Sequence, residues 1–307
     1  MIIIEGVRPQ QGDQKIGSIK EPKGGVMPLG AHMSISGGVD KAIDRGQEVG
    51  CETIQIFTRT PRQWKMREFS HEEVEDFKRK REETGINPIF AHDTYLINLG
   101  SPDEELWKRS IAVLEDELAR CDALGLPFLV VHPGSHVGRG EEAGLERIAQ
   151  ALSLALSHKP AYKAQLLLEI TAGQGSNLGY SFQQLARLME LTEKGERLGI
   201  CFDTCHAFVA GYEIRTPEGY DATFDELNEL IGLERLKVFH LNDSKGDLGG
   251  RLDRHEHIGK GRLGLEPFRM ILNDERFRGL PMVLETPKGP KMEEDIENLR
   301  VLRSLRG

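Results

Sequence analysis

Short apolar runs along the chain end, one after another, in a histidine, an aspartate or a glutamate. The runs P-I-F-A-H, F-L-V-V-H and L-L-L-E end at His92, His132 and Glu169. Three later runs follow the same pattern and end at Asp203, His240 and Glu285. An apolar strand with a polar last residue is buried along its length and opens at its carboxyl end. If these strands are parallel in one closed sheet, six ligand-type side chains converge at one end of it.

Helix-type segments alternate with the apolar runs. We predict strands near residues 27–34, 53–58, 88–92, 128–132, 165–169, 198–203, 236–241 and 282–286. Helices are predicted near residues 38–49, 70–84, 103–124, 141–158, 181–194, 217–231, 265–277 and 291–305. The second helix has Ser70 as its expected N-cap and Glu73 at the capping-box position.

Eight strand–helix repeats without a flexible linker predict an α/β fold, a single-domain (β/α)₈ TIM barrel over residues 28–307. A doubly wound open sheet is the alternative. It explains the pattern less well, because ligand-type residues would then not surround one axis. Residues 1–27 mix Gly, Pro, Gln and both charges without the apolar core of a signal peptide, so we expect a flexible extension.

Composition narrows the class of protein. Apolar residues make up 38% of the chain and charged residues 29%, and no apolar run is long enough for a membrane span. The four cysteines show no C-x-x-C spacing, so we expect structural thiols in a reduced, cytoplasmic protein. Cys205 in particular has the wrong neighbours for a nucleophile and is expected to be buried.

Two loops add further candidate metal ligands to the six strand ends. The segment D-T-C-H contributes His206, and D-R-H contributes Asp253 and His255. A lone histidine or carboxylate of this kind is more often an ordinary hydrogen-bonding residue, but six at one end of a predicted barrel reverse those odds. Zinc accepts both histidine nitrogen and carboxylate oxygen. Nine candidates exceed the four ligands of one zinc ion and suit two or three ions that share a bridging carboxylate.

Two glycine-rich segments lie among these candidates. Residues 259–264 match G-x-G-x-x-G, but more than ten polar residues separate them from the preceding strand, which argues against a dinucleotide site. We expect that loop to contact a phosphate instead, since it precedes a helix after the seventh strand. Residues 171–179 are expected to form a tight turn after Glu169, with backbone donors that face the site.

Basic and apolar side chains are predicted at the barrel mouth. The loop after the second strand contains Arg59, Arg62, Gln63 and Trp64, and the loop after the third contains Tyr95 and Leu96. Such side chains can bind a phosphate backbone and wedge into a base stack. Packing of Trp64 and Tyr95 against neighbouring loops explains them equally well.

The assembled motifs resemble the endonuclease IV family, the zinc-dependent abasic-site endonucleases. The resemblance runs from about Leu29 to about Arg303 and rests on the segments A-H-D-T-Y-L-I-N-L-G, H-P-G-S-H, L-E-I-T-A-G-Q-G-S-N-L-G, D-T-C-H-A-F-V-A-G-Y, H-L-N-D-S-K, D-R-H-E-H-I-G-K-G and V-L-E-T-P. One departure is Ile170, where a polar residue is expected after the glutamate.

The resemblance implies three zinc ions. The first is expected on His92, His132 and Glu169. The second is expected on Glu169, Asp203, His240 and Glu285, so that Glu169 bridges two ions and is also the catalytic candidate. The third is expected on His206, Asp253 and His255. The resemblance also implies that the lesion in the DNA duplex is entered by Arg62, Tyr95 and Leu96.

The expected reaction is hydrolysis of the phosphodiester bond 5′ to an abasic site in double-stranded DNA. A hydroxide bound to the zinc cluster is expected to attack and leave a 3′-hydroxyl, with 3′-end cleaning as an additional activity. We expect a monomer without an obligatory protein partner. The net charge of −9 argues against a nucleic-acid partner, but three Zn²⁺ would leave −3. Basic residues expected beside them at the mouth are Arg59, Arg62, Lys245, Arg251, Arg254, Lys260 and Arg262.

Two other functions are open from the residues. A sugar isomerase or epimerase on a related barrel would use a single divalent ion on Glu169, Asp203, His240 and Glu285. It would leave the remaining candidates without a role, and a metal count of three rather than one separates the two. A non-catalytic DNA-binding module would bind abasic DNA without cleaving it.

Overall fold

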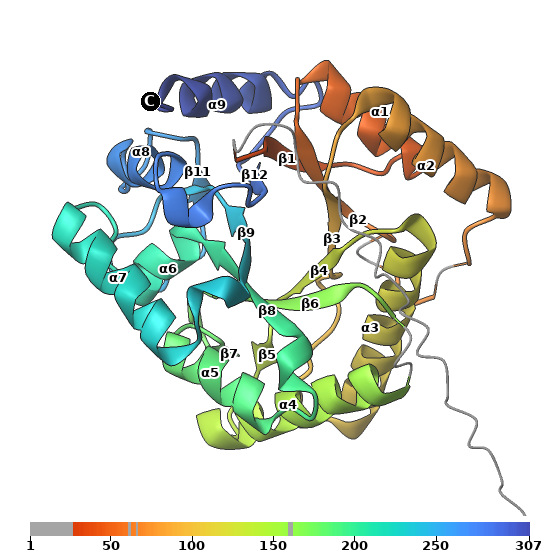
Figure 1. Cartoon of the computed structure of the whole chain (residues 1–307). Coiled ribbons are helices and arrows are strands. Elements are labelled where there is room, and N and C mark those ends of the chain that lie inside the picture. Colours follow the sequence, from red (N-terminus) through yellow and green to blue (C-terminus); the bar gives the residue numbers. More distant parts are fainter. Residues whose placement is uncertain (1–26, 61–62, 66, 159–161) are drawn as a thin grey trace, which may run out of the picture.

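Eight parallel strands form a closed barrel, and the long helices lie around its outside (Figure 1). The computed structural model describes residues 27–307 apart from 61–62, 66 and 159–161. The predicted extension therefore lies outside the described residues, except for Met27, which is buried. The predicted (β/α)₈ barrel is confirmed.

The barrel strands match the predicted runs to within a few residues at each end. They are β1 (Leu29–Met33), β2 (Thr53–Phe57), β3 (Ile89–His92), β4 (Phe128–Val131), β6 (Gln165–Glu169), β8 (Leu198–Asp203), β9 (Leu236–His240) and β12 (Met282–Leu284). Their order around the barrel is β1-β12-β9-β8-β6-β4-β3-β2. Because all neighbours pair in parallel, every carboxyl end lies at the same mouth.

A helix follows each barrel strand on the outer side. These helices are α1 (Asp40–Glu48), α2 (His71–Thr84), α3 (Glu104–Leu124), α4 (Glu141–His158), α5 (Phe182–Leu191), α7 (Pro217–Leu230), α8 (Glu266–Leu272) and α9 (Glu293–Ser304). The predicted capping box is confirmed: the Ser70 hydroxyl accepts from the Glu73 amide, and the Glu73 carboxylate accepts from the Ser70 amide.

Several short elements were not predicted. Helix α6 (Thr204–Ala210) begins directly after β8. The described residues also form short 3₁₀ helices, η1 (Gly195–Arg197), η2 (Leu233–Arg235) and η3 (Glu275–Phe277). Two small antiparallel sheets join the strand pairs β5 (Gly134–Ser135) with β7 (Asn177–Leu178) and β10 (Asp243–Ser244) with β11 (His255–Glu256). Such elements are too short to leave a periodic pattern in the sequence.

The inside of the barrel explains why the strand ends are polar. A separate apolar cluster fills it, made of Phe90, Val130, Leu167, Cys201, Val238 and Val283. Alternate residues of a strand point to the same side, so the residue two positions further along also points inward. Those next residues are the six candidates His92, His132, Glu169, Asp203, His240 and Glu285. The barrel core thus places one ligand-type side chain above each of its six apolar residues.

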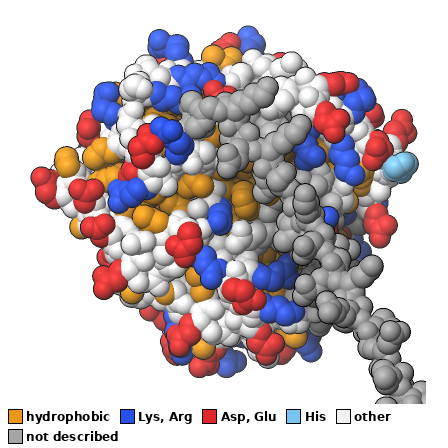
Figure 2. Space-filling model, in the orientation of Figure 1, with side chains coloured by type: hydrophobic (Ala, Val, Ile, Leu, Met, Phe, Trp, Pro, Cys, Tyr) orange, Lys and Arg blue, Asp and Glu red, His pale blue; other side chains and the backbone are white. Residues whose placement is uncertain are grey.

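The candidate site is not visible on the face in Figure 2. Outside the area of grey atoms, that face shows acidic and basic side chains intermixed around hydrophobic ones, with histidine only at the edge. Among the described residues, no helix combines the length and the apolar character needed to cross a bilayer.

Candidate metal centre

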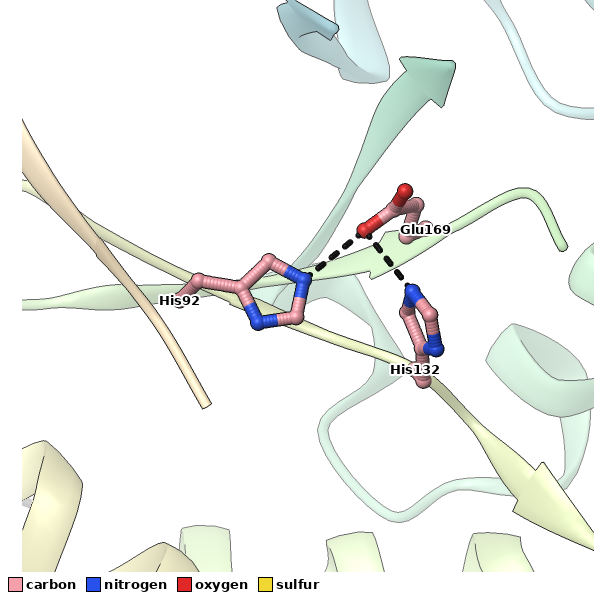
Figure 3. A group of neighbouring side chains, drawn as sticks. All are labelled: His92, His132 and Glu169. Carbon is pink, nitrogen blue, oxygen red and sulfur yellow. Dashed lines mark hydrogen bonds and ion pairs between the residues drawn. The ribbon is translucent and has the colours of Figure 1, made fainter. Parts of the chain in front are cut away.

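The first group of candidate ligands comes from β3, β4 and β6. The Nε2 atoms of His92 and His132 lie 3.0 and 3.3 Å from the same oxygen of Glu169, Oε2 (Figure 3). Glu169 is completely buried, and the Nδ1 atom of His92 lies 2.9 Å from the carbonyl oxygen of Asp93. The contact with Asp93 orients the imidazole so that its other nitrogen faces the glutamate.

The second group meets the other oxygen of the same glutamate. The Nδ1 atom of His240 lies 3.1 Å from Glu169 Oε1, 3.3 Å from Glu285 Oε2 and 3.8 Å from Asp203 Oδ2. Glu169 therefore presents Oε2 to one set of side chains and Oε1 to another. This is the arrangement that a carboxylate bridging two ions requires.

The third group lies beside the second, where loops add to the strand ends. Asp253 Oδ1 is 3.2 Å from His206 Nε2 and 3.7 Å from His255 Nε2. His255 Nε2 is also 3.7 Å from Oδ2 of Asp203, which joins this group to the second one. The backbone amide of Asp253 donates to the side-chain oxygen of Gln174, in the glycine-rich segment 171–179. That segment thus places a candidate ligand in addition to forming a turn.

Backbone carbonyls fix the two histidines of the third group. His206 Nδ1 donates to the carbonyl oxygen of Ile170 at 3.0 Å, and His255 Nδ1 donates to that of Glu285 at 3.2 Å. Because a carbonyl can only accept, Nδ1 carries the proton in both rings and Nε2 is left for an ion. Ile170 is itself buried in the apolar core and acts on His206 through its backbone. A polar side chain is not needed at that position for this contact.

The donor atoms fit divalent cations. The ligand atoms of each of the three predicted groups all lie within 4.8 Å of one another. The Nε2 atoms of His206 and His255 are both buried. Within the described part of the chain, His255 Nε2 has no hydrogen-bond partner, and the neighbour of His206 Nε2 is the carboxylate of Asp253 at 3.2 Å. Buried polar atoms are rarely left without a partner, and a cation at this point would provide one. Histidine nitrogens together with carboxylate oxygens suit zinc best among the common ions.

Charges in the centre are complementary. Burial alone would raise the pKa of Glu169, but the positive charges and hydrogen bonds of the surrounding histidines hold that pKa well below its ordinary value. Burial would lower the pKa of His92, yet the hydrogen bonds with Asp93 and Glu169 raise it well above 6.5. The pKa of His206 is likewise raised well above 6.5 despite its burial, chiefly by Asp203 and Asp253. Histidines and carboxylates therefore pair with each other where no ion is bound.

Cysteine thiols also lie near the second and third groups, at Cys201 and Cys205. Both are buried and free of disulfides, as predicted. Burial raises the pKa of Cys205 to about 12 and that of Cys201 well above its ordinary value. Since a metal binds the thiolate form, these protonated thiols are poor ligands compared with the carboxylates beside them.

Three residues that contact the ligands were missed in the sequence. Gln55 donates to Glu285 and accepts from His240, Asn242 donates to Asp203 at 2.7 Å, and His32 Nδ1 lies 3.7 Å from Glu285 Oε1. Gln55 and His32 interrupt the apolar runs of β2 and β1, and that interruption was the signal available. The signal is weak, because both residues lie inside an apolar strand and not at its end.

The residues expected to contact DNA differ in their surroundings. Tyr95 is 73% exposed, and its ring packs edge-on against Phe57 at a centroid distance of 5.3 Å. Leu96 is half-buried, and Arg62 lies outside the described residues. Trp64 is also half-buried and packs against the guanidinium group of Arg109, 4.1 Å from the ring centroid. Among the described side chains of this set, Tyr95 is the most exposed to solvent.

The expectation that Arg59 belongs to the basic face at the mouth is wrong. Arg59 is 1% exposed, forms an ion pair with Asp116 at 3.0 Å and donates to the carbonyl oxygens of Gln63 and Trp64. Its charge is used within the fold, to hold the loop that follows β2. The sequence could not distinguish this role from a surface role, since both place an arginine next to a strand end.

The phosphate role expected for residues 259–264 is also not supported by the structure. The backbone amides of Gly261 and Leu263 both donate to the carboxylate of Asp243, at 2.9 Å each. Gly261 lies so close that an added Cβ atom would meet that carboxylate at 2.4 Å. The loop thus binds an anion of its own chain with the amides that a phosphate would need.

A cavity of about 290 Å³ opens over the three groups. Residues of each group line it, together with His32, Tyr95 and Lys288. A larger hollow of about 390 Å³ lies on the outside of the barrel beside α2 and α3, and no histidine lines it. The chemistry is therefore concentrated at the barrel mouth, where a substrate would meet all three groups and the exposed Tyr95 at once.

Known proteins resemble this chain in both fold and sequence. Residues 43–305 match the model of a family described as xylose isomerase-like TIM barrel. The chain is similar to a protein of Chloroflexus aurantiacus named probable endonuclease 4, with 56% identity over 90% of this chain and 97% of that protein. A protein of Geobacter sulfurreducens with the same name is 50% identical over 90% of this chain and 94% of its own length.

Solved structures give the same picture. Endonuclease IV from Thermus thermophilus is 41% identical, with a TM-score of 0.79 over 91% of this chain and 98% of that chain. A D-tagatose 3-epimerase-like protein is 19% identical with a TM-score of 0.68 over 91% of this chain and 97% of that chain, and shares the fold alone. The chain therefore belongs to the endonuclease IV family of nucleases.

Proposed function

We propose that the chain is a DNA-repair endonuclease that hydrolyses the phosphodiester bond 5′ to an abasic site and leaves a 3′-hydroxyl. The observation that carries the proposal is the convergence of three ligand groups on one cavity, with an exposed tyrosine at its edge. The names of the relatives from Chloroflexus and Geobacter and of the Thermus structure agree with this activity.

Three zinc ions would be held by the three groups. The first would lie on His92, His132 and Glu169, the second on Glu169, Asp203, His240 and Glu285, and the third on His206, Asp253 and His255. When bound, such ions make a nucleophile available near neutral pH and neutralise charge on the attacking and leaving oxygens of a phosphodiester. Glu169 is the catalytic candidate in this scheme, because its two oxygens face different groups.

The chain's own residues would supply the fit to the lesion. Tyr95, with Leu96 next to it and Arg62 in the preceding loop, would enter the base stack where a base is missing. An aromatic ring can occupy that space without reading the sequence, because every base presents a π-face. Binding would then depend on backbone charge and on the ease of unstacking, so it should weaken steeply with salt.

A 3′-end-cleaning activity follows from the same arrangement. A blocking group that is joined to a 3′ end through a phosphodiester would present to the ions the same kind of linkage as an abasic site does. The proposed chemistry requires neither a base nor a continuing strand on the 3′ side of that linkage. We therefore propose cleaning of blocked 3′ ends as a second reaction of the same centre.

A duplex with one abasic site and a label at the 5′ end of the damaged strand tests the proposal. We expect one incision, immediately 5′ to the site, and a product that a DNA polymerase extends directly because it ends in a hydroxyl. An intact duplex of the same sequence is the control and should remain uncut. A product that is not extended until its 3′ end has been repaired, or equal cutting of the intact duplex, would contradict the proposal. About three zinc ions per chain, rather than one divalent ion, would separate this enzyme from a sugar epimerase.

A further inference from the structure

We infer that Gln55 is a positioning residue that orients two candidate ligands, His240 and Glu285, with a single side-chain amide. The inference deepens the proposed metal centre and rests on it. Gln55 lies in the middle of β2 and is completely buried. Its neighbours along the strand, Ile54 and Ile56, are apolar. A buried amide in such a run needs partners for its oxygen and for both of its N–H groups.

The direction of the amide follows from its partners. Glu285 Oε1 lies 2.6 Å from Gln55 Nε2, and because a carboxylate only accepts, the amide nitrogen must face it. The amide oxygen then faces His240 Nε2 at 2.8 Å. This imidazole nitrogen must carry a proton in order to donate. The Nδ1 atom of His240, which faces Glu169 and Glu285, is therefore the one left for an ion.

The remaining N–H of the amide is also used. It points to His32 Nδ1 at 3.0 Å, so that rotating the Gln55 amide by half a turn would break three hydrogen bonds together. On Glu285, the bond to Oε1 leaves Oε2 facing His240 Nδ1 at 3.3 Å. Gln55 thus selects the nitrogen of one ligand and the oxygen of the other that point into the second ligand group.

The amide makes these contacts across the barrel. Strands β9, β12, β1 and β2 follow each other around the sheet, so β12 and β1 separate Gln55 from His240. A backbone contact between neighbouring strands cannot replace a bond over that distance. The residue two positions earlier in the same strand, Thr53, is equally buried but donates to the carbonyl oxygen of Pro88, away from the ligands. Thr53 therefore provides a matched control.

The test compares zinc affinity of the full-length wild type with that of two variants. Gln55→Met keeps the length of the side chain and removes its hydrogen bonds, whereas Thr53→Val removes a buried hydrogen bond that touches no ligand. Competition with a chromophoric chelator should show that one of the three zinc sites binds about 10- to 100-fold more weakly in Gln55→Met. Thr53→Val should keep all three affinities. Circular dichroism should show both variants folded.

A second readout needs no variant. In the zinc-loaded wild type, nitrogen-15 NMR of the His240 ring should show a proton on Nε2 and none on Nδ1. A deprotonated Nε2, or unchanged zinc affinities in a folded Gln55→Met protein, would overturn the inference and leave the metal centre intact. A wild-type chain that binds no zinc would overturn the metal centre, and the inference with it.

Discussion

Asp203 caps the helix that carries His206. The Asp203 Oδ1 atom accepts a hydrogen bond from the His206 backbone amide at 2.8 Å, and α6 begins at the next residue, Thr204. The other oxygen of the same carboxylate faces His240 and His255. One strand-end residue therefore starts a helix and belongs to the candidate ligands, and it links the second group to the third.

Replacing Asp203 should separate these two roles. Asp203→Ser retains an oxygen that can cap α6, whereas Asp203→Ala does not, and neither side chain can replace the carboxylate as a ligand. We expect both variants to lose most of the incision activity. In the metal-free state, urea unfolding should show Asp203→Ser to be more stable than Asp203→Ala by about 1 kcal/mol. Equal stability of the two variants would mean that the cap contributes nothing to α6.

Replacing Glu169 should affect two ions at once. Glu169→Gln keeps the shape of the side chain but removes the charge that both groups share. We expect the zinc content to fall from about three ions per chain to about one. Loss of several kcal/mol of charge stabilisation should lower the incision rate by about a thousandfold or more. Glu266→Gln changes the same charge on the exposed face of α8 and should leave zinc content and rate unchanged. Full zinc content in Glu169→Gln would contradict the bridging role.

Zinc binding should release protons. In the metal-free protein, carboxylate partners raise the pKa of His92 and His206 well above 6.5 in spite of their burial. A proton on either ring must leave before an ion binds, so zinc affinity should rise with pH. Adding zinc to a weakly buffered solution of the metal-free protein should therefore acidify it. No pH change near neutrality would show that these histidines are already unprotonated.

The same raised pKa values make the metal-free protein sensitive to pH in the opposite direction. The folded chain holds these protons more tightly than the unfolded chain does. The stabilisation is fully present below about pH 6.5, the ordinary histidine value, and is lost as pH rises through the raised pKa values of His92 and His206. Urea midpoints of the metal-free protein should therefore fall as pH rises above 6.5. Midpoints that rise over that range would contradict the raised values.

Tyr95 should act on DNA and not on the metals. Its ring is exposed and touches Phe57 from the side, so its removal should change stability little. Tyr95→Ala should weaken incision of the abasic duplex by about 10- to 100-fold, the range expected when one stacked ring is lost, with zinc content unchanged. Tyr95→Phe keeps the ring and should remain close to wild type. Loss of activity in the phenylalanine variant would assign the role to the hydroxyl group instead.

The convergence of the candidate ligands could be predicted from the sequence because strand periodicity and barrel closure act together. Once Phe90 and Leu167 face inward, His92 and Glu169 must do so as well, and parallel closure brings their carboxyl ends together. Hydrogen bonds across the barrel leave no such mark. Gln55 reaches its partners only because the sheet closes into a barrel. The pattern of residues within β2 carries no information about which side chains that closure brings together.

Loop residues were harder to interpret for a related reason. The role of a loop side chain depends on which partner the fold brings to it. Arg59 was expected at the mouth, but α3 brings Asp116 to it and buries its charge. The loop of residues 259–264 was expected to contact a phosphate, but the fold places the carboxylate of Asp243 against its Gly261 and Leu263 amides. In each case the role was determined by an aspartate that the fold, and not the local sequence, brings into contact.

The proposed function depends above all on three metal ions, held by the three groups, that together perform the incision. The test is a zinc titration of the metal-free protein. The incision rate of a duplex that contains one abasic site is measured after each addition of zinc. We predict no activity without zinc, full activity at about three equivalents per chain and no further gain beyond that. Activity that persists after exhaustive chelation, or that is complete at one equivalent, would contradict the three-ion centre.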